Sequence, residues 1–188
     1  MHKIPTIFIR DFTNNGKITR DWHPDCFAVR DGLTTATVKY DGSCCMIRDG
    51  RLYKRYELQP GRAAPAGFES SGEPDSVTGR QTGWLVVGMG PDDQWHREAL
   101  DTITDRSTLA DGTYELCGPK VQGNPNKIVR HILIPHGVDV VSVKPYTYES
   151  LQQYLTSTVH EGIVFWRDHK PVGKIKRRDF GLPWPVKG

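Results

Sequence analysis

The sequence predicts an α+β fold in which antiparallel β-sheets dominate and a few short helices intervene. Short apolar, β-branched runs alternate with Asp-Gly turns, which is typical of hairpins. Two further segments have apolar residues at helical spacing, and strands and helices follow one another irregularly. The 188 residues suit a single compact domain that spans residues 1–188.

The first strands form an antiparallel meander. Strands are expected at residues 34–39, 43–48 and 51–58. Asp41-Gly42 separates the first two, and Asp49-Gly50 separates the second and third. Glycine tolerates the positive φ of a tight turn, so these dipeptides predict that the chain reverses direction twice.

Residues 59–83 contain most of the proline, glycine and serine of this half of the chain and show little apolar periodicity. Such a composition predicts a long mobile loop.

Two short helices are expected at residues 93–103 and 148–156. The second has Tyr148, Leu151 and Leu155 at helical spacing, and Thr147 precedes it as a candidate N-cap. Further strands are predicted at residues 83–89, 112–116, 138–143, 161–167 and 172–176.

The composition excludes several classes of protein. No run approaches the roughly 20 apolar residues that span a bilayer, and the N-terminus lacks the pattern of a signal peptide, so we expect a cytoplasmic protein. Four cysteines without a C-x-x-C pair suggest neither a zinc site nor disulfides. The net charge of +3 is small, but basic residues gather near the C-terminus at Lys170, Lys174, Lys176, Arg177, Arg178 and Lys187.

Lys39 ends a predicted strand immediately before a tight turn, Tyr40-Asp41-Gly42. This position presents an amine at the rigid margin of a sheet, where a covalent catalytic lysine would have to lie. Four such residues also occur in many unrelated turns, so the interpretation depends on other residues of the chain.

Five segments in order resemble the motif series of covalent nucleotidyltransferases, the superfamily of ATP-dependent RNA and DNA ligases and mRNA capping enzymes. They are Lys39-Tyr40-Asp41-Gly42, Lys54-Arg55-Tyr56-Glu57, Tyr114-Glu115-Leu116, Glu161-Gly162-Ile163-Val164 and Lys174-Ile175-Lys176. The resemblance implies a nucleotidyltransferase (ATP-grasp-like) domain.

Three stretches narrow the resemblance to small ATP-dependent 5′-to-3′ RNA ligases. They are residues 39–46, residues 115–125 and residues 133–137. The implied reaction joins a 5′-phosphate and a 3′-hydroxyl of RNA through a lysyl-AMP intermediate and an adenylylated RNA end. ATP donates AMP, Mg²⁺ (or Mn²⁺) assists, and RNA repair is the implied role.

The chemistry explains why basic residues accompany the nucleophile. An ordinary lysine has a pKa of about 10.4, and only its uncharged amine attacks phosphorus. Nearby cations disfavour the ammonium form and also stabilise charge that develops on the α-phosphate. Lys174 and Lys176 are spaced to lie on one face of a strand, which suits a shared phosphate.

The resemblance assigns roles residue by residue. Glu115 is expected to hold ribose hydroxyls, and Glu161 to engage metal or the reacting lysine. Asp41 is expected to hold the turn or orient the amine or a metal-bound water. The implied catalytic residues are Lys39, Lys174, Lys176 and Glu161; the nucleotide-binding residues are Lys39, Asp41, Gly42, Arg55, Glu115, Glu161, Ile163, Lys174 and Lys176; the metal ligands are Glu161, Glu115 and Asp41.

Two assignments stay open between neighbours. Either Lys54 or Arg55 reaches phosphate, and the guanidinium fork favours Arg55. Either Ile163 or Val164 forms one wall of the adenine site, with an aromatic from residues 138–146 as the other wall. His131 and His136 lack the spacing of a metal site and are interpreted as structural.

The chain departs from the family pattern after the last motif. It ends at Gly188, so no OB-fold is expected, which disfavours DNA ligases and capping enzymes. Arg62 and Arg80 lie in the 59–83 loop, which we expect to close over ATP or RNA. Two alternatives remain: another covalent nucleotidyltransferase that seals DNA or uses GTP to cap RNA, and a non-catalytic module that binds RNA ends.

Overall fold

A computed structural model describes residues 4–186, apart from the side chain of Ser107. Lys187, expected to belong to the basic C-terminal run, lies outside this range. The chain divides into two compact units, which we describe separately. Unit 1 comprises residues 41–136, and unit 2 comprises residues 4–40 together with residues 137–186. The expectation that residues 1–188 act as one domain stays a prediction.

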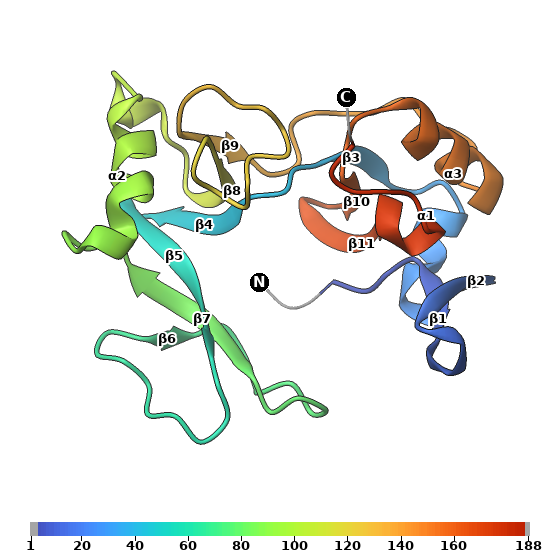
Figure 1. Ribbon diagram of the computed structural model, residues 1–188, viewed down its shortest axis with the longest axis horizontal. Helices are drawn as coiled ribbons and strands as arrows, with labels where there is room; N and C mark the ends of the chain where they lie inside the picture. Colours follow the sequence, from blue (N-terminus) through green and yellow to red (C-terminus); the bar gives the residue numbers. More distant parts are fainter. Residues whose placement is uncertain (1–3, 187–188) are drawn as a thin grey trace. The chain divides into compact units, whose positions relative to one another are not determined.

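Unit 1 is built on a six-stranded antiparallel sheet, in the order β6-β7-β5-β4-β8-β9. Figure 1 shows helix α2 (Gln94–Asp101) next to this sheet. Its strands are β4 (Ser43–Arg48), β5 (Arg51–Leu58), β6 (Glu69–Ser70), β7 (Gln81–Val86), β8 (Gly112–Cys117) and β9 (Ile132–Pro135).

One face of the six-stranded sheet forms the core of unit 1. Every second side chain of the central strands points into this core, because side chains alternate between the two faces of a strand. Ala99 of α2 packs against them. The buried cluster consists of Cys45, Ile47, Leu52, Ala99, Tyr114, Leu116 and Val121.

Unit 2 contains a three-stranded antiparallel sheet in the order β11-β10-β3 and a separate β1-β2 hairpin. The elements are β1 (Phe8–Asp11), β2 (Lys17–Trp22), α1 (Phe27–Arg30), β3 (Thr35–Lys39), α3 (Tyr148–Ser157), β10 (Gly162–Arg167) and β11 (Lys170–Lys176). Five short 3-10 helices occur in the described chain, at residues 12–14, 24–26, 91–93, 106–108 and 177–180.

The core of unit 2 lies on one face of the three-stranded sheet. Ala36, Ile163, Phe165 and Ile175 contribute from the sheet. They pack with α3, the hairpin and nearby segments through Ile7, Phe8, Ile18, Cys26, Val29, Val143, Tyr146, Leu151 and Leu155. The opposite face of this sheet is therefore left for polar side chains.

Most predicted elements are confirmed. The structure is α+β with antiparallel sheets and short helices, and β4 and β5 have the predicted bounds. Thr147 caps α3 as expected: its hydroxyl accepts a hydrogen bond from the Ser150 N–H at 3.2 Å. Cys26, Cys45 and Cys117 are buried, and no disulfide links the cysteines of residues 4–186.

The predicted strand at residues 138–143 is wrong. Only Val140 forms a bridge, with Thr37, although the Val38 N–H also donates to the Asp139 carbonyl. Conversely, β1, β2, β6 and β9 were not predicted. The mobility expected for residues 59–83 stays a prediction; β6 lies within this segment, and β7 begins at Gln81.

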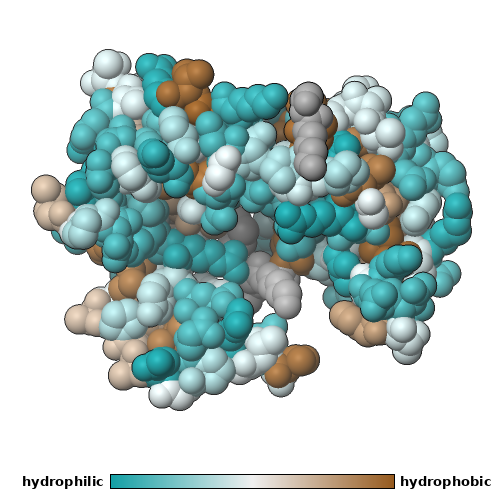
Figure 2. All heavy atoms as spheres, in the orientation of Figure 1, coloured by the Kyte–Doolittle hydropathy of each residue, from teal (hydrophilic) through white to brown (hydrophobic). Residues whose placement is uncertain are grey.

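None of the helices in residues 4–186 has the length and apolar character needed to cross a membrane. Figure 2 shows a mostly hydrophilic surface on the face in view, with small separate apolar patches.

Candidate functional site

The strand register of unit 2 aligns two lysines on either side of one glycine. Gly162 in the central strand β10 pairs with Lys39 of β3 on one side and with Lys176 of β11 on the other. Gly162 is required here because a Cβ atom would lie only 2.2 Å from the Ile175 carbonyl oxygen. The close approach of the strands therefore excludes a side chain between the lysines.

Glu161, which directly precedes Gly162, forms ion pairs with both lysines. One carboxylate oxygen is 2.6 Å from Lys39 Nζ, and the other is 2.7 Å from Lys176 Nζ. The Glu161 side chain is only 6% exposed, so its carboxylate is shielded from water, whereas the Lys39 and Lys176 side chains are 20% and 32% exposed. Its backbone carbonyl accepts from the Arg177 N–H at 2.8 Å, which fixes the end of the strand.

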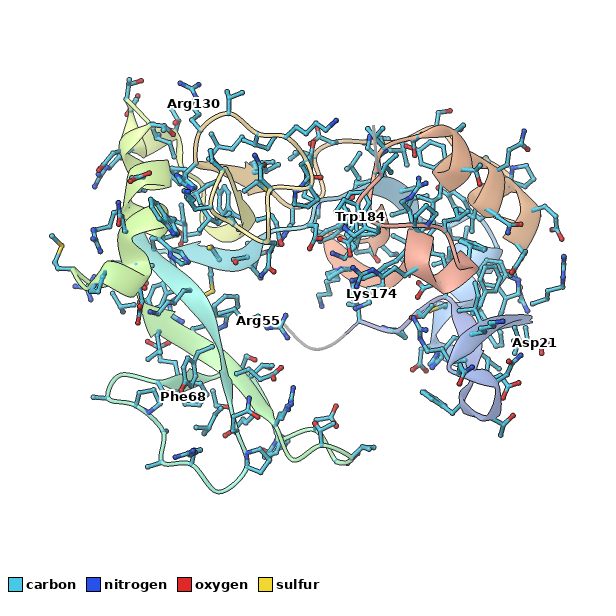
Figure 3. All side chains as sticks on the ribbon, viewed as in Figure 1. Asp21, Arg55, Phe68, Arg130, Lys174 and Trp184 are labelled. Atoms are coloured by element: carbon cyan, nitrogen blue, oxygen red, sulfur yellow. The ribbon has the colours of Figure 1, made fainter. Side chains whose placement is uncertain are left out.

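Lys174 completes this group, which we call the lysine cluster: Lys39, Glu161, Lys174 and Lys176. Lys174 lies two residues before Lys176 on the same face of β11, and Figure 3 shows its side chain beside this strand. Its backbone is held by the segment before β1, because its N–H donates to the Pro5 carbonyl and its carbonyl accepts from the Ile7 N–H, both at 3.0 Å.

The environment of Lys174 disfavours its charged form. Burial, followed by repulsion from the charges of Lys176 and Lys39, lowers the pKa of Lys174 to about 8. Asp179 and Glu161 oppose the shift but do not cancel it. Among residues 4–186, no carboxylate lies within ion-pair distance of the Lys174 ammonium. A partly buried cation of this kind is suited to bind an anion from outside the chain.

A second group, in unit 1, surrounds Glu115 of β8. One Glu115 oxygen accepts from the Gly42 N–H at 3.0 Å, and the other accepts from His136 Nε2 at 2.9 Å. His136 Nδ1 is in turn 2.9 Å from the Thr113 hydroxyl, which orients the ring. Gly42 also needs to be glycine, because a Cβ would lie 2.2 Å from the Leu116 carbonyl oxygen.

Arg55 and Cys44 belong to the same group, which we call the Glu115 cluster: Gly42, Cys44, Arg55, Glu115 and His136. Cys44 pairs with Glu115 in the sheet register, and Arg55 of β5 interacts with the Cys44 thiol. Burial, followed by the charge of Glu115, raises the pKa of Cys44 to about 11, so this thiol is a poor nucleophile. Arg55 is exposed and carries its positive charge on the face that holds Glu115.

The structure separates the neighbours Lys54 and Arg55, between which the sequence left a choice. Lys54 lies on the opposite face of β5 and forms an ion pair with the buried Asp93. Burial disfavours ionisation of Asp93, but hydrogen bonds from Lys54 and the Gly88 N–H lower its pKa below the ordinary value. Lys54 is therefore committed to a structural pair, and Arg55 remains accessible.

The nucleotide-binding role of Ile163 stays a prediction. Ile163 has no exposed surface and lies in the core of unit 2, on the face of β10 opposite the lysine cluster. It offers no contact to a ligand in this conformation. Val164 pairs with Lys174 and Thr37 and lies on the same face as the lysines, so it is the candidate of the two.

Sequence reasoning missed two contacts around the motif turn. Asn126 donates from its side-chain amide to the Asp41 carbonyl at 3.2 Å. Trp166 Nε1 donates to the Thr37 hydroxyl at 2.8 Å, on the face of the sheet that bears Lys39. No spacing rule links these residues, since each pair is far apart in sequence; only the fold brings them together.

The structural role of His131 and His136 stays a prediction, and His136 contacts Glu115. His131 is buried, stacks on Trp95 and lies 2.8 Å from Glu98. Within the described chain, no group of three or more histidine, cysteine, aspartate or glutamate side chains is arranged to hold a metal ion. The lysine cluster offers one carboxylate, which suits Mg²⁺ only if phosphate oxygens and water supply the other ligands.

A comparison with known protein families matches residues 75–188 to the family described as RNA ligase 1. This segment is more than half of the chain and includes Glu115, Glu161, Lys174 and Lys176, whereas Lys39 precedes it. A search of the curated proteins finds no match. The chain belongs to the RNA ligase 1 family.

Proposed function

We propose that this protein is an ATP-dependent RNA ligase in which Lys39 accepts AMP and passes it to RNA. The observation that carries the proposal is the lysine cluster. Lys39 contacts a shielded carboxylate, and the neighbouring Lys174 lacks an ion-pair partner among the described residues. The first feature provides a proton acceptor beside the amine, and the second provides a cation for the α-phosphate.

In the first step, the Lys39 nitrogen attacks the α-phosphorus of ATP. A phosphorus–nitrogen bond forms, the bond between the α-phosphorus and the bridging oxygen breaks, and pyrophosphate leaves. The amine must lose a proton, and the nearest acceptor is Glu161 Oε2, 2.6 Å away. Lys174 and Lys176 stabilise the negative charge that develops on the α-phosphate.

In the second step, a 5′-phosphate oxygen of RNA attacks the same phosphorus. The phosphorus–nitrogen bond breaks, and Lys39 recovers its proton. In the third step, a 3′-hydroxyl attacks the 5′-phosphate, AMP leaves, and a phosphodiester bond forms while the hydroxyl proton is released. The lysine cluster thus returns to its starting state.

The remaining residues have supporting roles in this proposal. Glu115 binds ribose hydroxyls, and its geometry supports this role because the Gly42 N–H and the His136 ring already orient its two oxygens. Arg55 binds phosphate, and Val164 contacts adenine in place of Ile163. Glu161 would help to hold Mg²⁺, which when bound would neutralise phosphate charge.

The experiment that tests the proposal is intact mass spectrometry of the full chain after incubation with Mg²⁺ and each ribonucleoside triphosphate. We expect an increase equal to one AMP with ATP alone. Lys39→Ala and Lys39→Arg should give no adduct. Lys17→Ala, which removes an exposed lysine at the start of β2, should behave as wild type.

Other results would identify the alternatives. A GMP adduct would indicate a capping enzyme, and joining of DNA but not RNA would indicate a DNA ligase. Binding of RNA ends without any nucleotide adduct would indicate a non-catalytic module. Sealing of 5′-phosphate and 3′-hydroxyl RNA ends by the wild type, but not by the Lys39 variants, would support the RNA ligase activity.

A further inference from the structure

The connection between β8 and β9, Gly118–His131, is a basic and acid-free loop, which we call the β8-β9 loop. Residues 116–138 are the longest stretch of the sequence without aspartate or glutamate. Lys120, Lys127 and Arg130 are exposed in the loop. We propose that the β8-β9 loop binds the sugar–phosphate backbone of the RNA substrate, an inference that rests on the proposed ligase function.

The charge of the loop is uncompensated within the described residues. Glu98 and Glu115 reach the two histidines of this stretch, but no carboxylate in residues 4–186 lies within ion-pair distance of the three exposed cations. Elsewhere in unit 1, some basic side chains do have partners: the partly exposed Arg48 pairs with Glu69, and the exposed Arg80 pairs with Glu57. Cations that lack an internal partner and share one loop favour an external polyanion.

The loop is held in one conformation by its own polar side chains. Asn124 closes a small ring, because its side chain donates to the Ile128 carbonyl at 3.0 Å and accepts from the Ile128 N–H at 2.8 Å. The Lys120 N–H donates to the buried His131 ring at 3.3 Å. A preformed loop loses less conformational entropy on binding than a disordered one.

The surface of the loop suits nucleic acid rather than a small anion. Figure 3 shows the Arg130 side chain extending outward from the loop, and the adjacent Val129 side chain is 89% exposed. The three cations lie at separate positions along the sequence of the loop. Separate cations follow a phosphate backbone, and an apolar side chain among them provides a contact for ribose or base.

The ends of the loop connect it directly to the Glu115 cluster. β8, which carries Glu115, leads into the loop, and β9 leads out of it to His136. In the middle of the loop, Asn126 donates to the Asp41 carbonyl in the motif turn. RNA bound here would therefore contact the same unit that orients Glu115.

The test is a triple variant, Lys120→Ala, Lys127→Asn and Arg130→Gln, in the full chain. Asparagine is chosen at position 127 because the backbone φ is +54°, which asparagine tolerates. Lysyl-AMP formation, measured by intact mass, should be unchanged. The apparent affinity for a 5′-phosphorylated RNA oligonucleotide, measured in the AMP-transfer reaction, should fall by about tenfold to a hundredfold at moderate salt.

The salt dependence sharpens the test. If the loop makes three phosphate contacts, the slope of log affinity for single-stranded RNA against log salt should decrease in magnitude by about 2. The matched control removes three exposed charges elsewhere, Lys17→Ala, Arg51→Gln and Arg106→Gln, and should retain the affinity and slope of wild type.

The outcomes separate this inference from the proposed function. Normal lysyl-AMP formation with unchanged RNA affinity and salt slope would overturn the loop proposal and leave the ligase intact. Loss of lysyl-AMP formation in the triple variant would also overturn it, because the loop would then serve ATP. Absence of lysyl-AMP in the wild type would contradict the proposed function itself.

Discussion

The two candidate glutamates, Glu161 in unit 2 and Glu115 in unit 1, bind different kinds of partner. Glu161 contacts two ammonium groups, those of Lys39 and Lys176. Glu115 contacts a backbone N–H and a histidine ring. Each glutamate lies beside a glycine that has no room for a Cβ atom. The shared feature is rigid backbone geometry, and the difference is charge.

This difference explains how the two clusters divide the chemistry in our proposal. The lysine cluster has three ammonium groups and one carboxylate, so it attracts phosphate and offers a place for a proton. The Glu115 cluster orients an acceptor without neutralising it by a lysine, which suits hydrogen bonds from hydroxyl groups.

The largest expected effect separates the two glutamates directly. Glu161→Gln removes the proton acceptor next to Lys39 and should slow lysyl-AMP formation by about 10²–10³-fold. Glu115→Gln retains an oxygen acceptor and should mainly raise the KM for ATP, by about tenfold. Single-turnover measurement of the adduct at several ATP concentrations distinguishes the rate from the affinity. Equal losses of rate in both variants would contradict the different roles of Glu161 and Glu115.

Lys174→Met should give the next largest effect on activity. Removal of this cation should reduce lysyl-AMP formation by about 10–100-fold, because one fixed charge at the α-phosphate is lost. In wild type, ATP affinity should fall as pH rises through about 8, where free Lys174 loses its proton. The variant should lack this component of the pH profile. An identical profile in both proteins would contradict the role of Lys174.

Lys54 and Arg55 are neighbouring cations of unit 1 whose substitution should have different consequences. Lys54→Gln leaves the buried Asp93 without its ion-pair partner and should lower the free energy of unfolding by about 1–3 kcal/mol. Arg55→Gln should leave stability nearly unchanged and weaken ATP or RNA binding. Urea unfolding measures the first quantity. A stability loss at Arg55 as large as that at Lys54 would contradict the assignment of faces.

The smallest effect concerns the stability of unit 2. Because the pKa of Lys174 is lowered in the folded chain, the unfolded chain binds more protons between pH 8 and the ordinary lysine pKa near 10.5. The charge of Lys174 therefore destabilises the fold below pH 8, and this cost disappears as pH rises through that window. Lys174→Met should stabilise the ligand-free protein by roughly 1 kcal/mol at pH 7. Thermal unfolding at pH 7 and pH 10 should show that the variant is stabilised over wild type less at pH 10 than at pH 7.

Local patterns predicted the elements that depend on local interactions. The Asp-Gly turn at residues 49–50 set the bounds of β4 and β5, and the Thr147 cap set the start of α3. The pattern at residues 138–143 misled because alternating valines also suit a chain that makes a single bridge, at Val140. β9 was missed because its pairing with β8 depends on residues far away in sequence.

The residues of the candidate site were also predictable only where they depend on local patterns. The sequence indicated that Lys174 and Lys176 share a face, because strand alternation is local. It did not determine that Gly162 aligns Lys39 with Lys176, because register between strands is a tertiary property. Alternation also separates Lys54 from Arg55, but only the position of Asp93 decides which of the two forms a structural ion pair.

The most direct test of the central claim is to locate the AMP on the chain. Lys174 is the rival nucleophile, since its lowered pKa leaves more of its amine uncharged near neutral pH. After incubation of the full chain with ATP and Mg²⁺, proteolysis and tandem mass spectrometry identify the modified residue. We expect AMP on Lys39 alone. AMP on Lys174 of the wild type would contradict this expectation. Modification of Lys174 in the Lys39→Ala variant at the wild-type rate would contradict it as well.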